Sequence, residues 1–163
     1  MSKQQTATLD APRVETRGPL TVAGFAQTYR CDGPNDIPAL WQRLAPFIGN
    51  VPGEVGCGGY GVASGMISGK DSYQYLAGVA VKDASGLPGG FTAVEVPERR
   101  YAIFVHRGHA AALPDTTRAI LSEHLPRMGL KPAGEPGLIE TYDERFDPRT
   151  GSGEIELWIP VKP

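Results

Sequence analysis

The sequence lacks several features that would assign it to a class at once. Only two of its 163 residues are cysteines, Cys31 and Cys57, and their number and separation exclude a disulfide framework and a cysteine-based zinc motif. No apolar run approaches the ~18 residues that suggest a membrane-spanning helix. The net charge is only -2, so the chain has no basic footprint for nucleic acid. We therefore expect neither a membrane nor a nucleic acid as a direct partner.

Targeting and cofactor motifs are equally scarce. The N-terminal residues lack the apolar core of a signal peptide, which predicts a cytoplasmic protein. The glycine-rich segment Gly53–Gly61 contains no Lys-Ser or Lys-Thr pair and precedes a predicted strand, so it favours a flexible rim over a phosphate-binding loop. His106 and His109 have no nearby third ligand, which argues against a metal site. We expect no metal and no cofactor.

What the sequence does contain is an internal repeat at a spacing of 80 residues. The matched identities, in order, are Val14/Val94, Glu15/Glu95, Ala39/Ala119, Pro46/Pro126, Gly49/Gly129, Pro52/Pro132, Val81/Val161 and Lys82/Lys162. A duplicated unit of this size predicts two halves, residues 12–82 and 92–162, that cannot bury their apolar faces alone. We expect the halves to pack about a pseudo-two-fold axis, with a ligand cleft at their seam. Residues 1–10 are polar and are expected to be flexible, which leaves a single domain over residues 11–163.

Hydrophobic periodicity gives both copies the same order of elements. Helical spacing of apolar residues predicts a helix over residues 37–48 and another over residues 114–128, each with a proline near its last turn. Alternating or β-rich segments predict strands over residues 14–30, which a turn at residues 17–19 divides, and over residues 60–68, 73–82, 92–96, 100–106, 138–146 and 154–161. The resulting fold class is α+β: a duplicated βαββ unit forming an antiparallel sheet with two helices on one face.

Strand alternation also suggests which side chains share a face. In the last strand, Ile155, Leu157 and Ile159 form an apolar face that should meet the helices, which leaves Glu156 and Trp158 on the opposite face.

The strand before it shows a similar alternation. If Ile139 and Thr141 lie over the core, Glu140 and Tyr142 join the face that carries Glu156 and Trp158. A carboxylate beside aromatic rings suits an amphipathic or cationic organic molecule, because the ring faces attract cations. The same pattern also fits charges on the solvated outer face of a sheet.

The second half of the chain carries a family resemblance. It rests on the segments Val94–Pro97, Tyr101–Gly108, Leu125–Leu130, Ile139–Phe146 and Glu154–Val161. Together they resemble the GyrI-like effector-binding domain, the ligand-sensing domain of AraC-type and MerR-type multidrug regulators, which also occurs as a stand-alone protein. The resemblance implies the same duplicated βαββ fold, with a cleft for hydrophobic and often cationic molecules. It also implies that Glu140 is the acidic residue of that cleft.

The leading hypothesis is a stand-alone protein that senses or sequesters a hydrophobic or cationic small molecule, as a monomer or weak homodimer. Glu140 would be the counter-charge and Glu156 a second acid, while Trp158, Tyr142 and Tyr60 would supply flat contact area. About ten residues before the domain cannot form a helix-turn-helix, so direct transcriptional control is not expected.

Two alternatives follow from the resemblance. The first is a hydrolase of reactive electrophilic molecules, with Glu140 as the general base. The second is a protein inhibitor of a gyrase-like partner, as the family name suggests. The inhibitor would need an acidic patch, for which the sequence offers Glu135, Glu140, Asp143, Glu144 and Asp147. Whether the protein is an enzyme stays open at this point, with binding alone favoured.

Overall fold

The fold is described by a computed structural model, which covers residues 9–56, 58–65 and 71–162. The first half of the chain, the predicted first copy, contains β1 (Arg13–Arg17), β2 (Leu20–Arg30), α1 (Ile37–Leu44), η2 (Ala45–Phe47), β3 (Gly59–Ser64) and β4 (Ser72–Val81). The second half, the predicted second copy, contains β5 (Thr92–Val96), β6 (Arg99–His109), η3 (Ala110–Ala112), α2 (Leu113–Ala119), η4 (Ile120–His124), α3 (Leu125–Arg127), β7 (Leu138–Tyr142), β8 (Phe146–Asp147) and β9 (Ser152–Pro160).

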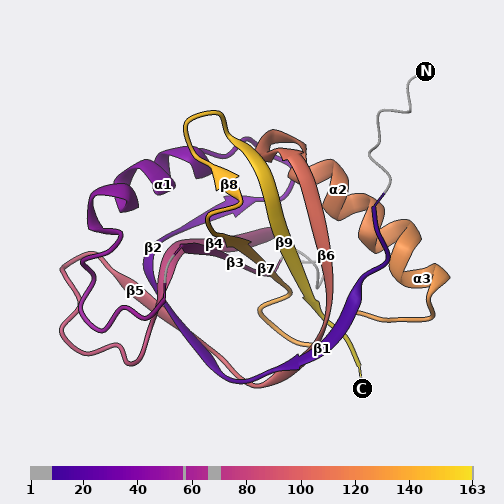
Figure 1. The fold of residues 1–163 in the computed structure, drawn as a ribbon, viewed down its shortest axis with the longest axis horizontal. Coiled ribbons are helices and arrows are strands. Elements are labelled where there is room, and N and C mark those ends of the chain that lie inside the picture. The colour runs from indigo at the N-terminus through magenta and orange to yellow at the C-terminus, as the bar shows by residue number, and fades with distance from the viewer. Residues whose placement is uncertain (1–8, 57, 66–70, 163) are drawn as a thin grey trace.

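The strands form one antiparallel sheet in the order β1-β6-β9-β7-β3-β4-β2-β5, with β8 paired to β9. This sheet cannot be flat. Only two residues connect β1 to β2, and they allow a Cα separation of roughly 11 Å. In a flat sheet the two strands would lie about 29 Å apart, because six strand spacings separate them. The sheet therefore curls until its two ends approach each other, as the arc of β1, β2 and β5 in Figure 1 shows.

Both helices cover the same face of the sheet, as predicted. Leu40 and Leu44 from α1 belong to one buried cluster with Ile120 and Leu125 from the second helix. The same cluster contains the β9 residues predicted to face the helices, Ile155, Leu157 and Ile159, each with 0% of its surface exposed. The α+β fold class is confirmed. None of the helices in the described residues is long and apolar enough to span a membrane.

Prolines near the helix ends change the local geometry. After α1 the chain tightens into η2, which contains Pro46. In the second copy, Pro126 has no backbone N–H and crowds the carbonyl group four residues earlier. The turn before it, η4, is π-helical, so α2, η4 and α3 run on as one irregular helix.

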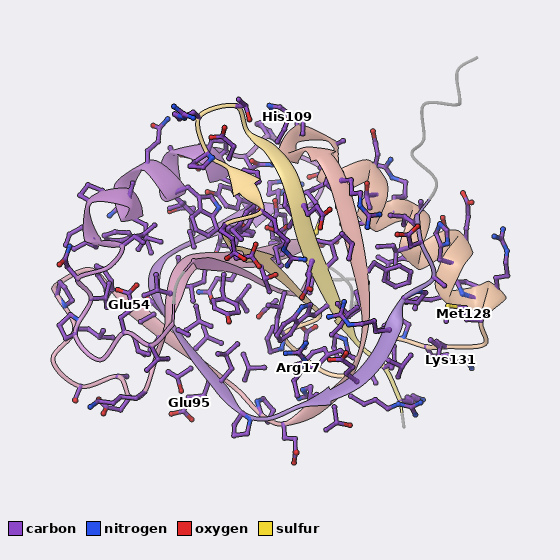
Figure 2. All side chains as sticks on the ribbon, in the orientation of Figure 1. Arg17, Glu54, Glu95, His109, Met128 and Lys131 are labelled. Carbon is purple, nitrogen blue, oxygen red and sulfur yellow. The ribbon has the colours of Figure 1, made fainter. Side chains whose placement is uncertain are left out.

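The enclosed side of the curled sheet is also filled. Val96, Tyr101, Ile103, Ile139 and Trp158 form a second buried cluster there. The side chains drawn in Figure 2 occupy the space that the curled strands surround. Both faces of the central strands are therefore buried, a fact that decides the geometry of the site.

Candidate functional site

The candidate site is built around Glu140, in the middle of β7 and near the centre of the sheet. Only 8% of Glu140 is exposed. Its Oε1 accepts two hydrogen bonds, from the hydroxyl of Tyr75 at 2.7 Å and from the hydroxyl of Tyr142 at 2.8 Å. Tyr75 comes from β4 in the first copy and Tyr142 from β7 in the second. The carboxylate thus lies where the two halves of the chain meet.

Half-buried aromatic rings separate this carboxylate from solvent. Trp41 of α1 donates its indole N–H to the hydroxyl oxygen of Tyr75 at 3.1 Å. Its ring also packs against that of Tyr142, with centroids 4.9 Å apart, and Tyr142 packs against Phe146 at 5.0 Å. The indole, the two hydroxyls and the carboxylate form one connected polar network inside an aromatic shell.

The electrostatics of Glu140 are those of a charge without a counter-charge. Burial raises the pKa of Glu140 above its ordinary value, and the hydrogen bonds from Tyr75 and Tyr142 only partly oppose that effect. The ion pairs formed by the described residues do not include Glu140. Burial also raises the pKa of Tyr75 and Tyr142, which keeps both hydroxyls protonated as donors. An ionised Glu140 is therefore suited to a cation, and its raised pKa also makes the carboxylate a stronger base than an exposed one.

A glycine opposite Glu140 gives the network its room. Gly61 of β3 is the cross-strand partner of Glu140. A Cβ atom at Gly61 would lie 2.1 Å from the hydroxyl of Tyr75 and 2.7 Å from Oε1 of Glu140. No side chain larger than hydrogen allows the tyrosine and the glutamate to meet over this strand.

The structure corrects one sequence-based prediction about the site. Glu140 and Tyr142 do not share a face with Glu156 and Trp158. β7 pairs with β9 so that Glu140 lies opposite Leu157, and directly paired residues share a face of the sheet. Glu140 therefore faces the helices.

The prediction failed because alternation assumes one apolar face and one polar face. Ile139 was placed over the helix-side core, but it is buried at 0% exposure in the cluster on the other face. Where both faces are buried, the position of an isoleucine does not say which face meets the helices.

The other three predicted residues gather on that opposite face. The rings of Tyr60 and Trp158 lie 6.4 Å apart, and Glu156 accepts a hydrogen bond from the indole of Trp158 at 3.0 Å. The guanidinium of Arg17, labelled in Figure 2, lies 4.8 Å from the centre of a Trp158 ring. This second aromatic cluster already holds a cation from its own chain.

Glu156 is neutralised in the same way. It forms ion pairs with Arg13 at 3.3 Å and with Arg145 at 3.4 Å. Burial opposes its ionisation, but the hydrogen bond from Trp158 and the two arginines outweigh burial, and the pKa of Glu156 is lowered. The environments of the two carboxylates therefore differ: the pKa of Glu140 is raised, whereas that of Glu156 is lowered. A role for Glu156, Trp158 and Tyr60 in ligand binding stays a prediction.

Two of the acidic residues proposed for a protein-inhibitor surface are not available as free surface charges. Glu140 is buried, and Asp143 is paired with Arg145 at 2.8 Å. Nor do the described residues contain a cluster of three or more His, Cys, Asp or Glu side chains that could hold a metal ion. His106 instead contacts the hydroxyl of Thr116 at 2.8 Å and the carbonyl oxygen of His109 at 3.0 Å.

A surface hollow of about 640 Å³ lies elsewhere, at the ends of β2, β4 and β5. It is lined by Pro19, Leu20, Thr21, Val55, Val81, Lys82, Glu95, Val96 and Pro97. None of the predicted site residues belongs to this lining, and the Glu140 network is closed by Trp41 and Tyr142.

Sequence reasoning missed two members of the site, Trp41 and Tyr75. Trp41 fits the apolar stripe of its helix, and periodicity cannot separate a core tryptophan from a functional one. Tyr75 lies within the predicted strand over residues 73–82, where no sequence feature distinguishes it. The available signal was the alternation of Gly59 and Gly61 within a strand, because glycine in a strand often marks a close approach.

Comparison with known proteins agrees with this fold. A model of the GyrI-like small molecule binding domain matches residues 10–162. The transcriptional regulator BrlR of Pseudomonas aeruginosa is 31% identical over 155 residues, which cover 91% of this chain. The match spans only 54% of BrlR, so the chain is about half as long as this relative.

Solved structures show the same architecture. The structure of SAV2435 bound to tetraphenylphosphonium aligns with a TM-score of 0.69 at 16% identity, covering 93% of each chain. An integron cassette protein of Vibrio cholerae aligns with a TM-score of 0.67 at 15% identity, covering 94% of this chain and 97% of that one. At these identities the structural likeness concerns the fold. With the family match over nearly its whole length, the chain belongs to the GyrI-like small molecule binding domains.

Proposed function

We propose that the small molecule bound by this domain is a lipophilic cation, and that Glu140 is its counter-charge. One observation carries the proposal: a buried carboxylate accepts hydrogen bonds from two tyrosine hydroxyls and has no basic partner among the described residues. An uncompensated charge in an apolar environment is costly, and an incoming cation would relieve that cost. The ring of Tyr142 adds a face that attracts the same cation.

The comparisons support this ligand class. The similarly folded SAV2435 has been solved with tetraphenylphosphonium, a cation that carries four aromatic rings. BrlR is a transcriptional regulator, so the proposed role here is to sense or sequester a cation. Tyr60, Trp158 and Glu156 are assigned to the opposite face, where Arg17, Arg13 and Arg145 already satisfy them.

The test is the affinity of Glu140→Gln for tetraphenylphosphonium, measured by calorimetry. The change keeps the shape of the side chain and removes its charge. The affinity should fall by about 5- to 150-fold, which corresponds to about 1–3 kcal/mol for a lost charge-assisted contact. Glu144→Gln is the matched control, because Glu144 is exposed in the turn after β7, and it should bind as the unmodified protein does.

Equal binding by Glu140→Gln and the unmodified protein would contradict the proposal. The same two proteins also test the hydrolase hypothesis. If the unmodified protein consumes a reactive electrophile such as an epoxide, and Glu140→Gln binds it without turnover, Glu140 is a general base rather than a counter-charge alone.

A further inference from the structure

The strand beside Glu140 is almost bare on the side that faces the helices. Residues of β3 that share a face with Glu140 are Gly59, Gly61 and Ala63, since Gly61 pairs with Glu140 and side chains alternate along a strand. Gly59 and Gly61 are both buried. A buried strand that presents two glycines leaves a shallow trough in the sheet, which other side chains have to fill.

Trp41 and Tyr75 fill that trough. A Cβ atom at Gly59 would lie 2.7 Å and 3.0 Å from two atoms of the six-membered ring of Trp41. The Trp41 ring therefore lies almost directly on the backbone of Gly59, as Tyr75 lies on that of Gly61.

Tyr75 and Trp41 are held in place by different surroundings. Tyr75 is 2% exposed and comes from a central strand. Trp41 is only half-buried and comes from the eight-residue helix α1. Its polar contact is the hydrogen bond from its indole N–H to Tyr75. Of the two rings on the glycine trough, Trp41 is the one that can leave without disturbing the sheet.

We propose that the backbone of β3 at Gly59 and Gly61 is a bed for an aromatic ring of the ligand, and that Trp41 occupies this bed until the ligand displaces it. The inference rests on the proposed function and specifies it further. The site selects aryl cations over alkyl cations of the same charge, because a flat ring fits a flat backbone surface and reaches Glu140 beside it. Gly59 is then a specificity-determining residue.

The first experiment asks whether Trp41 leaves. The indole N–H signals of Trp41 and Trp158 are distinguished in NMR spectra by comparison with Trp41→Phe. Exchange of the Trp41 indole proton with water is then measured with and without tetraphenylphosphonium. Displacement predicts faster exchange in the complex, because the bond to Tyr75 is broken. Slower or unchanged exchange would overturn the proposal, since Trp41 would then be a fixed wall.

The second experiment removes the Trp41 ring that closes the site. Trp41→Ala should bind tetraphenylphosphonium about tenfold more tightly, because the ligand no longer competes with a side chain that closes the site most of the time. A weaker affinity in folded Trp41→Ala would show that Trp41 is a contact of the bound ligand and would overturn the proposal that the ligand displaces it. Thermal unfolding of the variant checks that it is folded.

The third experiment adds a methyl group at Gly59, where the aromatic ring of the ligand is proposed to lie. Gly59→Ala should lower the affinity for tetraphenylphosphonium relative to tetrabutylphosphonium by about 3- to 10-fold, the weight of one aromatic contact. Gly89→Ala is the matched control, since a Cβ atom there has nothing within 4 Å, and its aryl-to-alkyl ratio should equal that of the unmodified protein. An unchanged ratio in Gly59→Ala would overturn the bed.

These outcomes separate the two proposals. If Glu140→Gln loses binding and the Trp41 indole stays protected in the complex, the proposal of a cation site at Glu140 would stand. Only the proposal that the ligand displaces Trp41 from Gly59 would be rejected. Tetraphenylphosphonium binding that is indifferent to Glu140→Gln would remove the proposed function, whatever Trp41 does.

Discussion

Glu140 illustrates how a single residue can oppose the stability of the fold that carries it. Its carboxylate is buried with two hydroxyl donors and no counter-ion among the described residues, and burial raises its pKa above the ordinary value of 4.5. A raised pKa means that the folded chain holds the proton more tightly than the unfolded chain. The stabilising effect of this proton is present at low pH and is lost as the pH rises through the raised pKa of Glu140.

The prediction at this scale concerns stability rather than binding. Glu140→Gln should raise the free energy of unfolding near neutral pH by about 1 kcal/mol, or about 2–4 °C in Tm for a chain of this size. The amide can still accept from one tyrosine and donate to the other. The gain should shrink as the pH falls through the raised pKa of Glu140, and it should vanish below 4.5, where Glu140 is protonated in both states. Calorimetric scans across this pH range measure it, and a destabilised variant at neutral pH would contradict it.

At the scale of elements, β7 and β9 separate two different kinds of aromatic cluster. On the helix side, Trp41 and Tyr142 cover a carboxylate without a cation. On the other side, Trp158 is 7% exposed, packs against Tyr101 at 5.4 Å, and carries Arg17 over its ring. The first cluster contains an acid that has no basic partner among the described residues, whereas the second contains a cation of the chain itself.

The second cluster should therefore act mainly on folding. Trp158→Ala is expected to lower the free energy of unfolding by about 3–5 kcal/mol, the usual result of removing a buried tryptophan ring. Urea denaturation followed by circular dichroism measures this loss. Should Trp158→Ala keep its stability but lose tetraphenylphosphonium binding, the ligand would have to reach the opposite face, as alternation first suggested.

At the scale of the whole molecule, the strand order is the same from either end when the copies are exchanged. The first strand of each copy pairs with the second strand of the other: β1 with β6, and β5 with β2. We propose that residues 12–82 and 92–162 are two related units of one domain. The first strand of each unit therefore lies at the edge of the other unit's part of the sheet.

This exchange predicts one cooperative unfolding transition. The calorimetric and van't Hoff enthalpies of unfolding should agree, and urea midpoints from circular dichroism and tryptophan fluorescence should coincide. A fragment that ends between β4 and β5 should stay unfolded alone, because β5 is missing from the edge of β2. Two separate transitions would show that the halves are independent, contrary to the strand exchange.

Much of this protein is determined by the sequence itself. Helical spacing and turn residues predicted both helices and the order of strands, because those signals are local. The apolar run of Ile155, Leu157 and Ile159 correctly identified the helix-facing side of β9. The segments around Glu140 and Trp158 were sufficient for the family, and they identified Glu140, which the structure places at the centre of a buried polar network.

Only the tertiary structure decided what surrounds Glu140. The side of the sheet on which it lies depends on the pairing of β7 with β9, and alternation is silent where both faces are buried. Tyr75, which donates to Glu140, lies 65 residues earlier in the chain, and Trp41, which donates to Tyr75, lies 99 residues earlier. Only the pairing of β3 with β4 and β7 and the packing of α1 bring these residues together. The glycines of β3 have meaning for the same reason. A missing side chain matters only once the fold brings a neighbour close enough to use the space.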